Sequence, residues 1–284
     1  VYKRQIESYL PIHQFSEVIK YSVFPTGKLF RPTLVYCMAH DLGDLTDDHK
    51  LAAMAIELHH TYTLIHDDLP AMDDDDYRRG RLASHKKFTE WEAILAGDAL
   101  MNNSYEILAE ITPKFLPKIL KYFAEATGAK GLILGQVKDL AGEDLTLEDI
   151  LEIHRLKTGE LIALCLTIPC IISNKEDEML RTIKNLGYAI GENFQILDDL
   201  CELTEDINKH EKEVNPFLKF PAQESISKLK QNAELIQSIC VENKLKHLME
   251  YNSLYTAKMK SKVIASLDKV NEYIKLDSSE LDRL

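Results

Sequence analysis

Two clusters of carboxylates interrupt apolar stretches of a chain that is otherwise patterned for helices, and this pairing restricts how the chain can fold. The first cluster holds Asp67, Asp68 and Asp73, and the second holds Asp198, Asp199 and Glu202. Neighbouring carboxylates repel one another and lose hydration when they are buried, so a packed interior excludes them unless a cation lies between them. The sequence therefore predicts helices that turn two acidic clusters towards a bound cation.

Helical periodicity dominates the rest of the chain. Apolar residues recur at the spacing of one helix face, for example at Leu51, Met54, Ala55, Leu58 and Tyr62, and no convincing run of alternating residues predicts a strand. With 284 residues, of which 45% are hydrophobic, the chain can bury a substantial core. Because no linker, repeat or low-complexity tract divides it, we expect one all-α domain over residues 1–284.

The composition argues against several classes of protein. A net charge of -12 and the lack of a basic stripe disfavour nucleic acid as a partner. The longest apolar run, Leu161 to Ile172, is shorter than the about 20 residues of a membrane-spanning helix, so it predicts a buried helix and no membrane insertion. Five scattered cysteines without paired spacing predict reduced thiols in a cytoplasmic protein, rather than a disulfide framework or a zinc site.

The first acidic cluster lies where a helix is expected to break. In an unbroken helix Asp67 and Asp73 would point in different directions, but Pro70 interrupts the helix and lets the chain bulge and return Asp73 towards Asp67. The aspartates at positions 74–76 are better explained as a solvated acidic turn.

The second acidic cluster is simpler, because it needs no break in a helix. Asp198 and Glu202 are i and i+4, and Gln195 precedes Asp198 by about one turn, so one side of a helix presents all three. Oxygen-only ligands favour magnesium, which usually joins one or two protein carboxylates to the phosphates of a substrate. The two clusters therefore predict a site that attracts an anionic ligand through a metal.

Compact groups of cations could face such a ligand from the other side. Lys28 and Arg31 lie one turn apart, Arg78 and Arg79 follow the first acidic cluster, and the sequence 157–159 (Lys-Thr-Gly) is expected to end a helix. Each group alone is commonplace on protein surfaces. Beside two acidic clusters, however, they predict the cationic half of a diphosphate site.

Three histidines and a short polar segment remain open to two interpretations. Ideal helix geometry does not aim His59, His60 and His66 at one ion, so zinc is disfavoured, and His60 is better explained as a hydrogen-bond donor to phosphate. Gln136, next to Gly135, and Asp139 could be polar groups of the site, although helix packing explains them equally well.

Several of these segments occur together in one family. In chain order they read GKLFRP, HTYTLIHDDLPAMDDDDYRRG, ILAGDAL, LGQVKDL, KTGELI and FQILDD, and the stretch from His60 to Gly80 is the most specific. Over nearly its whole length the chain resembles the trans-isoprenyl diphosphate synthases, and among them the bacterial farnesyl diphosphate synthases. The resemblance implies an all-α, single-domain helical bundle around a deep central cavity, with the two acidic clusters facing each other across its mouth.

The resemblance also implies a role for each candidate residue. Three magnesium ions are expected, two held by Asp67, Asp68 and Asp73, and the third by Asp198 with Asp199 or Glu202 in support. The implied isopentenyl diphosphate site consists of Lys28, Arg31, His60 and Arg79. The implied allylic diphosphate site consists of Arg78, Lys157, Thr158 and Gln195.

The implied reaction joins isopentenyl diphosphate to dimethylallyl or geranyl diphosphate and gives farnesyl diphosphate by ionisation, condensation and elimination. Magnesium and cationic side chains would stabilise the departing diphosphate, so the residues implied to be catalytic are Asp67, Asp68, Asp73, Arg78, Lys157 and Asp198. No protein nucleophile is required. Tyr62, five residues before Asp67, matches the family position that floors the hydrophobic tunnel, and a homodimer is implied as the assembly.

The chain departs from the family in its second acidic cluster and in the loop that follows. Glu202 stands where the family usually has aspartate, and residues 203–216 contain no glycine and only two lysines. Of these, Lys212 is preferred over Lys209 as the missing diphosphate contact. The alternatives are a longer-chain synthase such as a geranylgeranyl diphosphate synthase, a terpene cyclase, a non-catalytic partner subunit and a metal phosphohydrolase.

Overall fold

The computed structural model of the chain describes residues 6–43, 45–142, 144–209, 215–272 and 274–276, and of residues 204–209 it describes the backbone alone. Among the described residues the regular secondary structure is helical except for one hairpin of two short strands, which confirms the predicted all-α class. The elements are α2 (Phe15–Val23), α3 (Phe30–Leu42), α4 (Asp47–Asp67), β1 (Tyr77–Arg78), β2 (Arg81–Leu82), α5 (Ser84–Lys87), α6 (Glu90–Leu108), α7 (Leu116–Thr127), α8 (Leu132–Leu140), α9 (Leu147–His154), a π-helical turn (Arg155–Gly159), α10 (Glu160–Ile172), α11 (Asp177–Lys209), α12 (Pro216–Lys219), α13 (Ala222–Glu242), α14 (Lys246–Ala265) and α15 (Leu267–Val270).

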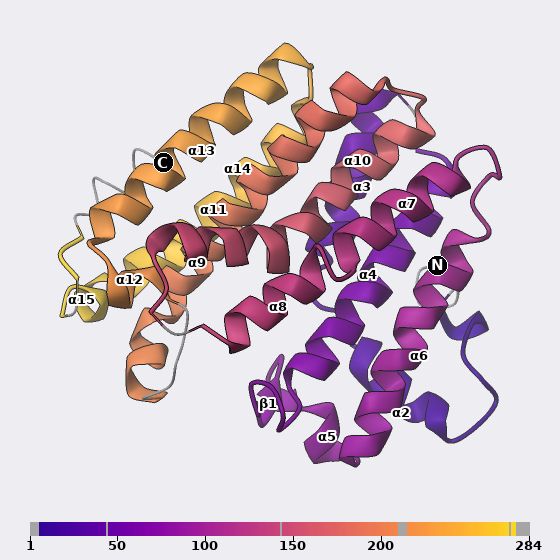
Figure 1. Cartoon of the computed structure of the whole chain (residues 1–284), viewed down its shortest axis with the longest axis horizontal. Coiled ribbons are helices and arrows are strands. Elements are labelled where there is room, and N and C mark those ends of the chain that lie inside the picture. Colours follow the sequence, from indigo (N-terminus) through magenta and orange to yellow (C-terminus); the bar gives the residue numbers. More distant parts are fainter. Residues whose placement is uncertain (1–5, 44, 143, 210–214, 273, 277–284) are drawn as a thin grey trace.

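Helix α10 lies at the centre of the bundle, where it packs against α3, α4, α7 and α11, with α7 and α11 on opposite sides of it (Figure 1). All its residues are buried, which confirms that the longest apolar run forms an interior helix. An apolar face on every side requires neighbours on every side, and this requirement places α10 between the two halves of the fold.

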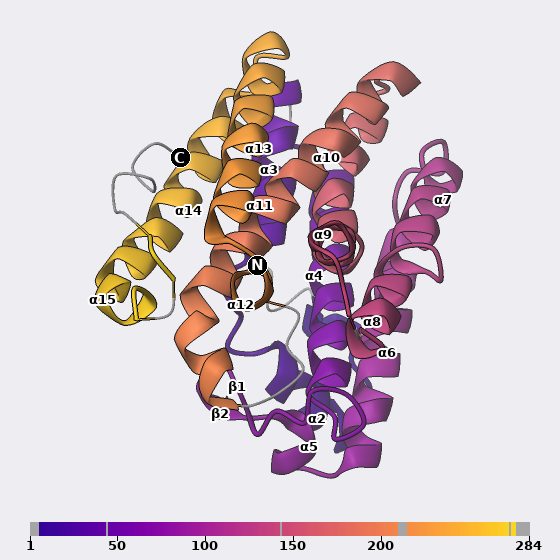
Figure 2. The same cartoon turned by 60° about the vertical axis from the view of Figure 1, so that its left-hand side comes forward.

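The two halves carry the two acidic clusters. Helices α4, α6, α7 and α8 form one half, and α11, α13 and α14 form the other (Figure 2). The main core joins residues from both halves, whereas a smaller apolar cluster around Leu197, Leu203, Phe217, Ile226 and Met259 fixes the C-terminal helices to α11. The first acidic cluster ends α4 and the second lies on α11, so the packing of the two halves decides how they face each other.

Within the described residues, none of the helices combines the length and the apolar character that crossing a bilayer requires. The assignment of the whole range 1–284 to a single domain stays a prediction.

Candidate functional site

A cavity of about 790 Å³ opens between α4, α8, the π-helical turn and α11. Most residues predicted for the site line it: Arg31, His60, Asp67, Asp73, Arg78, Lys157, Thr158, Gln195, Asp198, Asp199 and Glu202. Of the predicted residues that the structure describes, Lys28, Tyr62, Asp68 and Arg79 lie outside this lining. Lys212 is outside the described residues, and the side chain of Lys209 is not described either.

The first acidic cluster reverses direction as the sequence predicts. Helix α4 ends at Asp67, and the backbone N–H of Asp73 donates a hydrogen bond of 2.9 Å to the carbonyl of Asp67. Pro70 lies inside this reversal, where a missing N–H costs nothing. Both carboxylates therefore line the same cavity although six positions separate them.

Burial gives these two carboxylates an environment suited to a cation. Burial raises the pKa of Asp67 to about 6; Lys157 opposes this rise and Asp73 adds to it. Burial likewise raises the pKa of Asp73, again opposed by Lys157. Two acidic groups that disfavour each other's charge and offer only oxygen atoms fit a hard divalent ion, since such an ion removes the repulsion.

Asp68 faces the other way. Its carboxylate accepts hydrogen bonds from the Arg78 guanidinium, including one of 2.7 Å from Nε, and Arg78 also pairs with Asp75 at 3.0 Å. A metal would have to compete with Arg78 for Asp68. Its assignment as a ligand stays a prediction.

All three members of the second acidic cluster line the cavity, and Asp199 is the most deeply buried of them. Asp199 is only 7% exposed, and its carboxylate accepts a hydrogen bond of 2.9 Å from Gln195 Nε2 and lies 3.2 Å from His154 Nε2. Burial lowers the pKa of His154 to about 3, so this imidazole is neutral. Asp199 therefore lies beside His154 of α9, whereas Asp198 and Glu202 are the more exposed carboxylates of this cluster.

The structure corrects one detail of the cationic groups. The segment with Lys157 was expected to end a helix, but it forms a π-helical turn that continues directly into α10. Glycines from two other helices make room for it. A Cβ at Gly135 would lie 2.5 Å from the backbone nitrogen of Lys157, and a Cβ at Gly191 would lie 2.6 Å from Gly159 Cα. Such π-helical turns are often found at functional sites.

This turn delivers two side chains to the cavity. Lys157 Nζ pairs with Asp139 Oδ2 at 2.6 Å, and Thr158 Oγ1 donates a hydrogen bond of 3.1 Å to Gln195 Oε1. Because Gln195 also donates to Asp199, one chain of contacts links the turn to the second acidic cluster. The interpretation of Asp139 as a polar group of the site is thus favoured over simple helix packing.

A second group of cations lies at the start of α3. Arg31 is 9% exposed, and its Nη1 donates a hydrogen bond of 3.0 Å to His60 Nε2. Burial and the nearby arginines lower the pKa of His60 well below its usual value, so the neutral ring can accept this bond. Lys28 is exposed. The buried Glu57 balances this group, because Arg31 and Arg79 oppose the rise in pKa that burial causes at its carboxyl.

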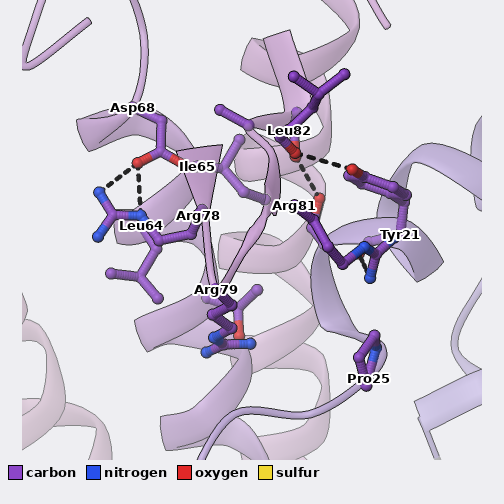
Figure 3. Close-up of a pocket in the computed structure, with 13 residues that line it drawn as sticks. Tyr21, Pro25, Leu64, Ile65, Asp68, Arg78, Arg79, Arg81 and Leu82 are labelled. Atoms are coloured by element: carbon purple, nitrogen blue, oxygen red, sulfur yellow. Dashed lines mark hydrogen bonds and ion pairs between the residues drawn. The ribbon is translucent and has the colours of Figure 1, made fainter. Parts of the chain in front are cut away.

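The hairpin carries three arginines, whose side chains point in different directions (Figure 3). Arg78 points to Asp68, whereas Arg81 Nη1 donates a hydrogen bond of 2.8 Å to the carbonyl of Phe24, and its guanidinium lies 3.8 Å from the centre of the Tyr21 ring. All three arginines line a small hollow beside α4, together with Tyr21 and Asp68. Sequence reasoning singled out Arg78 and Arg79 but missed the structural role of Arg81.

The histidines do not form a metal site. His59 Nδ1 lies 3.1 Å from Ser104 Oγ, and His66 Nε2 donates to the carbonyl of Ile94 at 3.1 Å. Among the described residues no three His, Cys, Asp or Glu side chains form a complete ligand set for an ion. Magnesium does not require one, because it usually keeps water and takes substrate phosphate as further ligands.

Tyr62 is a buried residue of α4. It is 7% exposed, and its ring lies 4.6 Å from that of His59 and 5.6 Å from that of His66. The cavity lining on α4 consists of His60, Thr63, Leu64 and Asp67. The role of Tyr62 as the floor of a tunnel stays a prediction.

Sequence reasoning did not single out three further polar residues of the site, which are Glu57, His154 and Asn215. Asn215 donates a hydrogen bond of 2.8 Å from its side chain to the backbone carbonyl of Asp199. His154 precedes Lys157 by one helical turn and Glu57 precedes His60 by one turn. A search for polar residues one helical turn away from each candidate residue would have found His154 and Glu57.

Comparisons with known proteins agree with this arrangement. Residues 12–248 match the family model described as polyprenyl synthetase. The farnesyl diphosphate synthase of Haemophilus influenzae is 38% identical over 240 residues, which cover 80% of this chain and 81% of that protein. The farnesyl diphosphate synthase of Micrococcus luteus is 40% identical over 191 residues, and the match covers 66% of each chain. The crystal structure of a geranyltranstransferase from Thermotoga maritima superimposes with a TM-score of 0.81 at 29% identity, covering 92% of this chain and 96% of that one.

Proposed function

Because the chain belongs to the polyprenyl synthetase family, we propose that it condenses isopentenyl diphosphate with an allylic diphosphate, dimethylallyl or geranyl, to give farnesyl diphosphate. One observation carries this proposal. Carboxylates from both acidic clusters line one cavity together with Arg31, Arg78 and Lys157, so carboxylates for a metal and cations for diphosphate face the same space.

Magnesium is the cofactor that these residues fit. Asp67 and Asp73 would hold it on the side of α4, and Asp198, with Glu202 in support, on the side of α11. We propose three ions in all, with Asp68 and Asp199 as further candidate ligands. When bound, magnesium supplies positive charge to the leaving diphosphate.

The cationic side chains divide between two diphosphates. Arg78, Lys157, Thr158 and Gln195 would bind the allylic substrate, and Lys28, Arg31, His60 and Arg79 would bind isopentenyl diphosphate. Lys157 pairs with Asp139 at 2.6 Å and would exchange this partner for phosphate oxygens. The exchange replaces one charge-assisted contact by another. Because the ammonium group of Lys157 is already desolvated in the free protein, phosphate binding requires no further desolvation of it.

The reaction then needs positioning and charge rather than a protein nucleophile. The bond between the allylic carbon and oxygen breaks, and its electrons leave with diphosphate. The double bond of the isopentenyl group attacks the allylic carbon, a new carbon–carbon bond forms, and loss of a proton restores a double bond. The released diphosphate is the proposed base. Lys157 and Arg78 would hold its charge while the bond breaks, the stage at which preorganised cations contribute most.

We propose a homodimer as the assembly and the cytoplasm as the location. Trp91, Ile94 and Leu95 expose 60%, 42% and 48% of their area at neighbouring positions on α6, and such an apolar stripe favours association with a second copy. All five cysteines lie in the part of the chain that the structure describes and are unpaired, as a reducing compartment favours.

A longer product is the second candidate, favoured by the position of Tyr62 outside the described cavity lining. Both candidates are tested by incubating the purified protein with magnesium, isopentenyl diphosphate and either dimethylallyl or geranyl diphosphate, and by separating the dephosphorylated products by chain length. We expect a fifteen-carbon product. A twenty-carbon product would replace the farnesyl assignment, and no elongation from either primer would refute the synthase function.

A further inference from the structure

Gly27 lies directly against the guanidinium of Arg79. A Cβ built on Gly27 would lie 2.8 Å from Arg79 Cζ, 2.8 Å from Nη2 and 3.0 Å from Nε, and these are the three nearest atoms it would meet. A real Cβ essentially never approaches other atoms so closely. The absence of a side chain at position 27 is therefore what admits the arginine.

The backbone does not explain the glycine. Only Gly43 and Gly80, among the described glycines, adopt the left-handed conformation that favours this residue. An alanine could adopt the backbone conformation of Gly27, so the space that Arg79 fills is the remaining reason for a glycine.

The hairpin determines where Arg79 points. Arg78 and Arg81 pair across the strands, which makes Arg79 and Gly80 the two central residues of a turn, with φ values of 55° and 73°. Two left-handed residues in a row characterise the tight turn that suits a twisted hairpin. A non-glycine residue in this conformation costs free energy, so the surrounding contacts must hold it there.

Contacts to the segment before Gly27 hold the hairpin. Tyr21 Oη donates a hydrogen bond of 2.8 Å to the carbonyl of Leu82, and Arg81 donates to the carbonyl of Phe24. Figure 3 shows Tyr21 and Arg81 together on one side of the hairpin, with Arg79 apart from them. The hairpin and the loop that carries Gly27 and Lys28 are thus fixed to each other.

We propose that Gly27 is a positioning residue that seats the Arg79 guanidinium against the loop that carries Lys28 and so completes the binding site for the diphosphate of isopentenyl diphosphate. This inference rests on the proposed function. It assigns no contact with substrate to Gly27 itself, which acts only through Arg79.

Substitution of Gly27 by alanine should separate positioning from stability. The atoms in the way belong to the end of a flexible side chain, so Arg79 can rotate aside at little cost in stability. Loss of one charge-assisted hydrogen bond weakens binding by about 10- to 100-fold. Gly27→Ala should therefore weaken isopentenyl diphosphate binding by about tenfold or more while leaving the KM for the allylic substrate unchanged.

A double-mutant cycle tests the link between the two residues. Calorimetric titration with isopentenyl diphosphate would compare the unsubstituted protein, Gly27→Ala, Arg79→Ala and the double variant, with Thr26→Ala as a control in the same loop. We expect Thr26→Ala to bind normally and Gly27→Ala to have no further effect once Arg79 is absent. Thermal unfolding of each variant would show that all are folded.

Two results would overturn the inference. One is unchanged binding by Gly27→Ala, and the other is an equal weakening by Gly27→Ala whether or not Arg79 is present. A wrong assignment of the function would give a different result, because the unsubstituted protein itself would then not bind isopentenyl diphosphate.

Discussion

Gly135 supports the π-helical turn from the side of α8, and its substitution by alanine should displace Lys157. The new Cβ would lie 2.5 Å from the backbone nitrogen of Lys157 and 2.9 Å from the carbonyl carbon of Leu156. These are backbone atoms, so no side-chain rotation relieves the clash. An ordinary contact begins at 3.4 Å, so the turn has to move by about 0.9 Å, the difference between 3.4 and 2.5 Å.

This movement should reduce activity more than stability. Overpacking a core typically costs about 1–3 kcal/mol, whereas alanine gains about 1 kcal/mol over glycine inside a helix, so unfolding should become easier by about 0–2 kcal/mol. A displacement of about 1 Å in a catalytic group can lower the rate about 100-fold. We expect kcat/KM for the allylic substrate to fall by about 10- to 100-fold.

The assay measures elongation at varied allylic diphosphate and saturating isopentenyl diphosphate, together with urea unfolding. Gly159→Ala is the matched control in the same turn, because its Cβ would lie 3.4 Å from the nearest atom outside the local helix, Tyr188 Cδ1, which is an ordinary contact. The control should retain its activity. If Gly135→Ala kept kcat/KM within about twofold of the unsubstituted protein, Gly135 would not position Lys157.

Three further perturbations test other parts of the site. Asp73→Asn should lower magnesium-dependent elongation by about 100-fold or more. The control Asp76→Asn, at a side chain that is 63% exposed, should leave elongation unchanged. Equal effects of the two substitutions would contradict a metal role for Asp73. Tyr62→Ala should lengthen the product, measured by chromatography, and an unchanged chain length would exclude Tyr62 as the floor. Burial lowers the pKa of His59 to about 3, so this side chain stays neutral in the folded protein. In the unfolded chain it gains a proton below about pH 6.5, so the free energy of unfolding decreases as the pH falls. Between pH 7.5 and 5.5, the free energy of unfolding measured in urea should fall by about 1.4 kcal/mol less for His59→Met than for the unsubstituted protein. Equal falls in the two proteins would refute this.

The sequence predicted those features that short-range chemistry determines. Helical periodicity identified the all-α class, and Pro70 explained how Asp73 returns to Asp67, because a proline inside a helix has local consequences. The same holds for Gln195 and Asp198, which share one helix and therefore line one cavity.

The features that the sequence did not predict depend on contacts between distant segments. The helix was expected to end after Lys157, but Gly135 and Gly191 come from other helices, and their small size is what lets the π-helical turn continue into α10. The partner of Asp68 is an arginine ten residues later, reached only because the hairpin folds back. Helix packing likewise decides that Tyr62 lies outside the cavity lining, which periodicity cannot determine when the helix is buried on many sides.

The central claim is that the two acidic clusters bind diphosphate through magnesium. Calorimetric titration with inorganic diphosphate, with magnesium and in the presence of a chelator, tests this claim directly. We predict measurable binding only with magnesium, because Asp67, Asp73 and Asp198 otherwise repel the anion. Asp67→Asn should weaken the magnesium-dependent binding. Equal affinity with magnesium and with the chelator would contradict the claim, since the cations alone would then account for binding.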